Sequence, residues 1–293
     1  MLIPGALLSS FPSATGVLTS VSVDNGDTDH TLIGQAIHTT GSQCAYMTLL
    51  APNSALDSEA VPALLEHLSK RSIKLGAFRV LADVDDSTPA FDVLRKAGFG
   101  IYARQRIWQL EEELASDPVG ITWQTASGAD LVAVKSLYHN LIPGLVQHVE
   151  PFSDERLSGF VCRQGGDLLA YAELKYGRRG IWMQPFIHPD AEELAQGLVD
   201  LLLNLPYRLS RPIYLCVRSY QSWLEHVIED LGAKPGPRQA MMVKHLAVPQ
   251  KAVRPVALPA LEGGQPEVTA SITRVRFEGA GKVSSPAAQS ENK

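Results

Sequence analysis

The chain has 293 residues, of which 45% are hydrophobic and 19% charged, and its formal net charge at pH 7 is −5. This length suggests about two domains, and the composition is that of a globular protein. The negative charge argues against a nucleic-acid partner, and three scattered cysteines are too few for a disulfide framework or a zinc site. We therefore expect buried thiols and a cytoplasmic protein.

The chain shows no signal for secretion or membrane insertion. Residues 1–16 contain no Lys or Arg and are interrupted by Pro4 and Pro12, unlike the basic start and continuous apolar core of a signal peptide. The longest helix-like apolar stretch, 198–205, is far shorter than a membrane span. We expect no membrane partner.

The first half of the chain predicts three strands, a helix, a strand, a second helix and a final strand. Turn residues around Gly26 and Gly41 separate the first three strands. Apolar residues at helical spacing identify the first helix, and Gly98 ends the second. The predicted strands are 18–23, 32–38, 45–50, 78–84 and 102–110, and the predicted helices are 58–73 and 88–97.

The second half repeats this order after an acidic linker at 111–120, with an additional strand and helix at its start. Residues 248–293 are rich in Pro, Ala, Gly and Ser, and we predict that they are disordered, although 268–277 alternates enough to pair as a strand. The predicted strands are 121–125, 159–162, 168–176, 181–187, 212–217 and 240–246, and the predicted helices are 129–138, 191–205 and 221–231.

A short motif marks the same place in both halves. Gly98 is followed by Arg104 and Gln105, and Gly232 by Arg238 and Gln239, at the same spacing. Each glycine follows a helix, and each glutamine precedes an apolar run. The repeat indicates two copies of one fold. A position repeated in both copies favours a structural role, so we expect the arginines to form ion pairs or to be exposed.

The order of elements resembles the GNAT acyltransferase superfamily. In that α/β fold, a mixed sheet splays between its fourth and fifth strands, and acyl-coenzyme A lies in the notch. The resemblance implies an abbreviated domain at 1–112, a complete domain at 120–247 and the disordered tail at 248–293. Since the first copy lacks the helices that usually wall the acceptor site, we expect any active site in the second copy.

The resemblance places coenzyme-binding residues around the notch of the second copy. They lie at the end of strand 181–187, where Pro185 suggests an edge or a bulge, at the start of the following helix, and at the start of the last helix. Only one glycine of the expected phosphate loop is present, and the first position is acidic, which is also the ordinary choice in a first helical turn. The candidate residues are Phe186, Ile187, Glu192, Ala195, Gly197 and Gln221.

Four residues are candidates for proton transfer, with Tyr220 and Glu173 the leading ones. Tyr220 can protonate a leaving thiolate, although the family's tyrosine is absent from its usual position, and an aromatic packing role is the alternative. Glu173 shares a strand face with Tyr171 and can act as a base, with a solvated hairpin residue as the alternative. Glu150 and His148 are further candidates for the base.

Two functions follow from these residues. The first is N-acetyltransfer from acetyl-CoA to a small-molecule amine or a peptide, in the second copy. The alternative is a non-catalytic GNAT-like module that binds a ligand or a protein, which the altered phosphate loops favour. The sequence does not indicate an oligomeric state.

Overall fold

The computed structural model describes residues 15–24, 30–110, 114, 117–152, 157–206 and 211–246. The predicted tail at 248–293, with its strand-like segment at 268–277, lies outside the described residues. Residues 111–113 and 115–116 of the acidic linker also lie outside them. Within the described residues, the predicted order of strands and helices is confirmed, except that α4 was not predicted and the helix expected over 191–205 is divided in two.

The strands are β1 (Thr15–Asp24), β2 (His30–Thr39), β3 (Cys44–Ala51), β4 (Arg79–Asp85), β5 (Gly100–Leu110), β6 (Gln124–Thr125), β7 (Gly159–Gln164), β8 (Asp167–Gly177), β9 (Gly180–Ile187), β10 (Ile213–Arg218) and β11 (Lys234–His245). The helices are α1 (Ala60–Lys74), α2 (Pro89–Lys96), α3 (Leu131–Leu141), α4 (Gly144–Val149), α5 (Glu192–Gln196), α6 (Leu198–Leu203) and α7 (Leu224–Asp230). Short 3-10 turns are η2 (Asn53–Ala55), η3 (Gly128–Asp130) and η5 (Ser219–Gln221).

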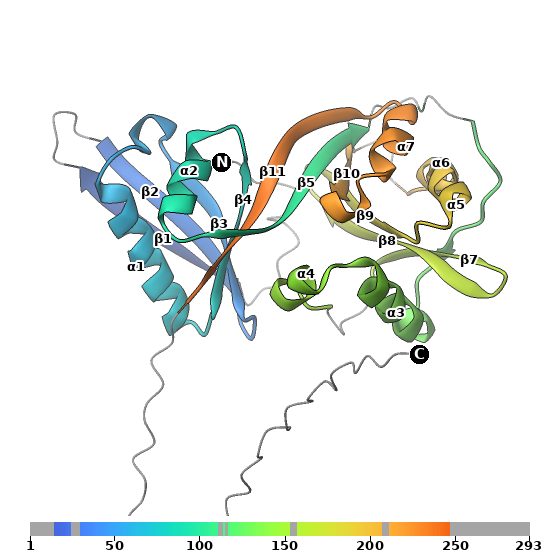
Figure 1. Cartoon of the computed structure of the whole chain (residues 1–293), viewed down its shortest axis with the longest axis horizontal. Helices are drawn as coiled ribbons and strands as arrows, with labels where there is room; N and C mark the ends of the chain where they lie inside the picture. The colour runs from blue at the N-terminus through green and yellow to red at the C-terminus, as the bar shows by residue number, and fades with distance from the viewer. Residues whose placement is uncertain are drawn as a thin grey trace, which may run out of the picture. The chain divides into compact units, whose positions relative to one another are not determined.

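The eleven strands form one mixed sheet, in the order β1-β2-β3-β4-β11-β5-β10-β9-β8-β7-β6. The two halves exchange their last strands, because β11 pairs with β4 of the first half and β5 pairs with β10 of the second. In Figure 1, β5 (green) and β11 (orange) run side by side between the two halves, where they pair antiparallel. The α/β mixed-sheet fold class is confirmed, and the domain boundaries at 112 and 120 stay a prediction.

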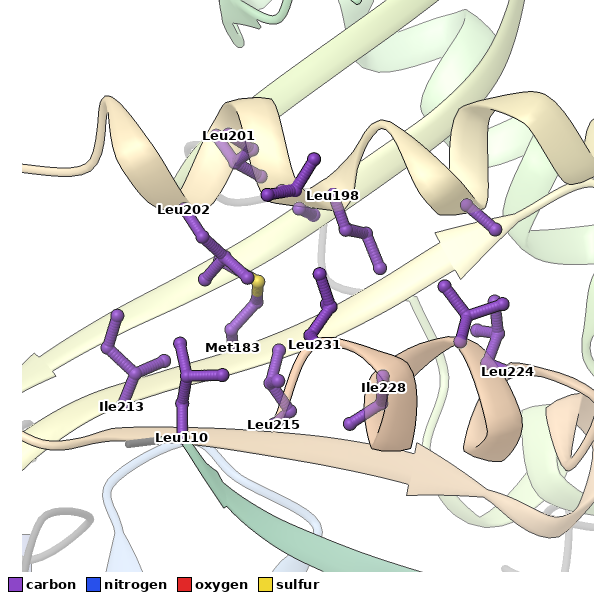
Figure 2. Packing of buried hydrophobic residues seen from close by; sticks show 14 of the residues in the cluster. Leu110, Met183, Leu198, Leu201, Leu202, Ile213, Leu215, Leu224, Ile228 and Leu231 are labelled. Carbon is purple, nitrogen blue, oxygen red and sulfur yellow. The ribbon is translucent and has the colours of Figure 1, made fainter. Parts of the chain in front are cut away.

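Helices that follow β3 and β9 bury apolar faces against the sheet. In α1, residues Val61, Leu64, Leu65 and Leu68 recur at helical spacing and are buried. In the second half, leucines of α6 and α7 meet the side chains of β9 and β10, as Figure 2 shows for Leu198, Ile228 and Met183. Each half therefore has a hydrophobic core on this side of its strands.

A third cluster of buried residues joins the halves. It contains Val134 and Leu137 of α3 and Val146 and Val149 of α4. Strand residues from both halves complete it: Cys44, Leu81, Tyr102, Ala103, Val161, Tyr171, Phe186, Met241 and Val243. The two helices of the second half therefore pack against strands of the first half as well as their own.

Three local predictions differ from the structure. The helix predicted over 191–205 is two short helices, α5 and α6, which meet at Gly197. Residues 140–153, which the sequence predicted to be a loop, contain α4, because the buried Val146 and Val149 were not recognised as a helical face. The last strand begins at Lys234 rather than at 240. Its start was not predicted, because prolines such as Pro235 and Pro237 are unusual inside a strand.

The three cysteines are free and buried, as expected. Among the described helices, none is long and apolar enough to cross a membrane. The described part of the chain also contains no group of His, Cys, Asp or Glu side chains that could hold a metal ion.

Candidate functional site

Strands β9 and β10 separate part-way along their length. Three parallel pairs join them, and the last is between Met183 and Leu215. Beyond that pair, β9 continues beside β8 and β10 continues beside β5, so the two strands no longer bond to each other. In the first half, β3 and β4 likewise pair only as far as Tyr46 and Leu81. Each half therefore has the separated strands that the resemblance predicted.

The register shows which backbone groups of β9 face this separation. The N–H of Ile181 donates to the carbonyl of Pro212 at 2.9 Å. Alternate residues direct their backbone groups to the same side, so those of Met183, Pro185 and Ile187 face β10. Proline has no N–H, and Pro185 lies where its absence breaks no ladder bond. Pro185 therefore occupies a local edge, and the pairing of β8 with β9 has no register shift.

The expected bulge lies in the other half. In β3, Met47 pairs with Ala36 and Leu49 with Gln35, so Thr48 between them is the additional residue. The Thr48 hydroxyl donates to the carbonyl of Gln35 at 3.4 Å. The two separations therefore differ in local structure.

Gln221 bonds to the end of β9, on the side where β9 and β10 are separated. Its side chain is 2% exposed, and Nε2 donates to the carbonyl oxygen of Ile187 at 3.3 Å. Every residue of β9 is buried. The side chain of Phe186 packs on the opposite face from the α5–α7 core, with its ring stacked on Tyr171 at a centroid distance of 6.0 Å.

The candidate phosphate positions are packed against the protein. Ala195 is fully buried in the core of the second half. At Gly197, an added Cβ would lie 2.6 Å from Cβ of Ile121, and the Gly197 carbonyl accepts a hydrogen bond from the Trp123 indole at 2.8 Å. Glu192 is the first residue of α5. Close packing against Ile121 therefore accounts for the glycine.

The two leading proton-transfer candidates, Tyr220 and Glu173, have different surroundings. Tyr220 is half-buried against the third cluster, where burial raises its pKa against an opposing effect of Arg218, and Glu150 adds to the rise. Both Glu173 and Tyr220 interact electrostatically with Tyr138. Glu173 is also 3.2 Å from the Lys175 ammonium, with its side chain 29% exposed. Tyr220 therefore packs against the third cluster, whereas the partner that the structure shows for Glu173 is Lys175.

A buried arginine in this region was not predicted. Arg218 ends β10, is 8% exposed, and its Nη2 lies 3.3 Å from Oε2 of Glu150. Tyr102 donates to the other oxygen of Glu150, and Tyr138 donates to the Glu150 backbone carbonyl. Burial alone would lower the pKa of Arg218, but Glu150 and other neighbours raise it overall, so the guanidinium stays charged. The sequence signal that could have indicated this site is a charged residue at the end of an apolar strand.

Comparisons with solved structures found distant similarities. A tandem GNAT protein from the clavulanic acid biosynthesis pathway is 16% identical, with a TM-score of 0.49, over 84% of this chain and 87% of that one. A GCN5-related N-acetyltransferase from Sphaerobacter thermophilus is 14% identical, with a TM-score of 0.48, over 74% and 80% of the respective chains. One from Kribbella flavida is 15% identical, with a TM-score of 0.48, over 82% and 91%.

The support for a GNAT-type fold is the strand order of this chain and the separation of strands in each half, as the resemblance predicted. With TM-scores below 0.5, these solved structures add no evidence about activity. No protein-family model matches the chain, and no curated protein matches it. Function therefore has to be inferred from the residues at the separation of β9 and β10 in this chain.

Proposed function

We propose that the chain is a non-catalytic GNAT-type module that binds a small ligand, and that its second half does not use acetyl-CoA. The observation that carries this proposal is the hydrogen bond from Gln221 to the carbonyl of Ile187. It occupies a backbone group of β9 on the side where β10 has separated.

The neighbouring residues support the same conclusion. A coenzyme in this separation needs backbone donors and a helix start that accepts phosphate. Pro185 offers no donor, and the space at Gly197 is taken by Ile121. The helix that follows has only five residues, so the dipole at its start is weak. These residues do not fit an acyl-coenzyme A, so no reaction step is assigned to it.

N-acetyltransfer from acetyl-CoA to a small-molecule amine or a peptide is the second candidate. It is favoured by one observation, the packing of Tyr220 against the third cluster, directly after the strand that separates from β9. The raised pKa of Tyr220 keeps its phenol protonated at neutral pH, as a proton donor requires. Under this candidate, Glu173 is the base and Tyr220 the acid.

Thermal unfolding of the full chain with acetyl-CoA separates the two candidates. A ligand that binds only the folded state stabilises it, by about 2.7 kcal/mol at a hundredfold excess over Kd. We expect no change in Tm up to millimolar acetyl-CoA. A saturable rise in Tm would overturn the first candidate. Glu173→Gln would then be expected to lower turnover without changing coenzyme affinity.

A further inference from the structure

The sheet ends in a long strand, β1, whose outer side pairs with no other strand in the described part of the chain. β1 has ten residues and pairs with β2 along its whole length, without a register shift. The strand at the other end of the sheet, β6, has only two residues. Edge strands are usually short, or contain Lys, Pro or a bulge, because unpaired backbone groups invite another strand. β1 contains no Lys, Arg or Pro, so this edge is open to pairing.

The hydrogen bonds of the first half show which backbone groups of β1 point outward. The carbonyl of Gln43, just before β3, accepts the N–H of Arg79 at 3.2 Å, so odd-numbered residues at the start of β3 direct their backbone groups to β4. Alternation through the registers of β3 with β2 and of β2 with β1 then leaves the odd-numbered residues of β1 with outward N–H and C=O groups. In agreement, the carbonyl of Thr19 accepts a hydrogen bond from Nη1 of Arg71 at 2.8 Å.

The exposed side chains along this edge are apolar. Val17 and Val21 are 62% and 57% exposed. Leu18 packs with Leu68 of α1, so alternation places the two valines and Thr19 on the opposite face of the strand. The open edge therefore presents two exposed valines at equal distances along the strand on either side of Thr19.

We propose that β1 pairs antiparallel with β1 of a second copy of this chain, about a two-fold axis at Thr19. In this register, Val17 of each copy lies opposite Val21 of the other, and the two Thr19 residues lie opposite each other. All three positions have outward backbone groups, so donors and acceptors match on both sides. Pairs of β-branched residues across strands stabilise a sheet, and no charged side chain lies at these positions.

The symmetry of the valines about Thr19 is the reason to assign a second copy rather than an unrelated strand to this edge. An isologous contact requires each surface to match itself, and these three positions do so. The inference concerns a surface apart from the separation of β9 and β10, and it does not depend on the ligand proposed there.

Arg71 makes this association weak. Its guanidinium reaches the Thr19 carbonyl, so the Arg71 side chains of the two copies approach each other near the axis. A carbonyl oxygen has two lone pairs and can accept from Arg71 and from the N–H of the second copy together. The two like charges oppose association, and salt screens that repulsion. The contact is therefore a reversible dimer that tightens as the ionic strength increases.

Sedimentation velocity of the full chain over a range of concentrations tests the association. We expect a monomer–dimer equilibrium whose dissociation constant falls when salt is added. Arg71→Gln removes the like charges at the axis, so its dissociation constant should be lower than that of wild type at low salt. A higher dissociation constant for this variant would overturn the axis at Thr19.

Two double variants test the register. Val17→Lys/Val21→Glu places opposite charges across both valine pairs, whereas Val17→Lys/Val21→Lys places like charges there. We expect the dissociation constant of the second variant to exceed that of the first at least about tenfold. Both positions are more than half exposed, so both variants should fold, as urea unfolding will check. Leu145→Lys, at a leucine of α4 that is 60% exposed, is the matched control and should leave the dissociation constant of wild type unchanged.

A wild-type chain that stays monomeric up to about millimolar concentration would overturn the proposal, because another segment or another protein would then have to cover the edge. Equal dissociation constants for the two double variants would also overturn it, since the dimer would then form through a different surface.

Discussion

The side-chain amide of Gln105 donates to the side-chain oxygen of Gln239 at 2.8 Å, although the two residues are 134 positions apart. They are the same residue of the repeated motif, one from each copy, and they lie opposite each other in the ladder of β5 and β11. The motif thus marks the place where the two halves exchange strands. Its arginines are structural, as expected: Arg104 lies 3.9 Å from Asp86, and Arg238 is exposed.

Removing one glutamine of the pair should destabilise the chain. Gln239→Leu leaves the buried Gln105 amide with only a 3.4 Å contact to Asp83. An unsatisfied buried donor costs about 1–3 kcal/mol, so we expect that loss in the free energy of unfolding measured in urea. Exposed Arg238→Ala should change it by less than about 0.5 kcal/mol. If the double variant Gln105→Leu/Gln239→Leu is as unstable as the sum of both single variants, the pair is not coupled.

The strand exchange predicts that neither half folds alone. A fragment of residues 1–119 lacks β11, which lies between β4 and β5, and a fragment of 120–249 lacks β5, which pairs with β10. Each fragment should therefore expose unpaired strand edges and aggregate. We expect no cooperative urea transition for either fragment by circular dichroism, and one transition for the full chain. A soluble, monomeric fragment with its own cooperative transition would show that each half can complete its sheet with its own last strand.

The helices and strands could be predicted because the spacing of their apolar residues is a local property of the sequence. The exchange of β5 and β11 could not, because it depends on which half of the sheet each strand joins. Both alternatives bury the same apolar faces, so periodicity cannot distinguish them. The role of Asp200 was equally hidden. Asp200 is a charged residue within the apolar α6, and its carboxylate is buried and accepts hydrogen bonds from the backbone N–H groups of Val119, Gly120 and Ile121 at 3.1–3.2 Å.

The candidate site was predicted only in part, for the same physical reason. Alternation placed Glu173 and Tyr171 on one strand face, and the strand end placed Tyr220 and Gln221 near the separation of β9 and β10. The approach of Glu150 to Arg218 joins the end of α4 to the end of β10, and no sequence spacing reports that contact. The hydrogen bond from Gln221 to the Ile187 carbonyl could not be predicted from sequence spacing either.

Asp83 should make stability depend on pH. Burial raises the pKa of this carboxyl to about 6, against a weaker opposing effect of Arg218, with Glu150 adding to the rise. A raised carboxyl pKa means that the folded state binds the proton more tightly, so stability falls as pH increases from about 4 to about 6. Asp83→Asn removes this titration and keeps an oxygen for Gln105. We expect the variant to gain stability relative to wild type across that window, measured by urea unfolding at each pH.

The control for this prediction is Asp57→Asn, since Asp57 is exposed. Its difference from wild type should not change over the same window. If the Asp83→Asn and wild-type stabilities stay parallel between pH 4 and pH 7, the carboxyl does not titrate in this range.

Gly197 distinguishes a packing role from a phosphate-binding role. Its φ of −66° suits any residue, so Gly197→Ala introduces no backbone strain. The added methyl would instead lie 2.6 Å from Ile121, and overpacking of this kind costs about 1–3 kcal/mol. The same substitution at Gly144, the first residue of α4, meets nothing within 4 Å and should be neutral or stabilising. Urea unfolding of both variants measures the difference. If Gly197→Ala unfolds like wild type but abolishes a Tm rise with acetyl-CoA, the glycine serves a ligand rather than Ile121, and the non-catalytic proposal fails with it.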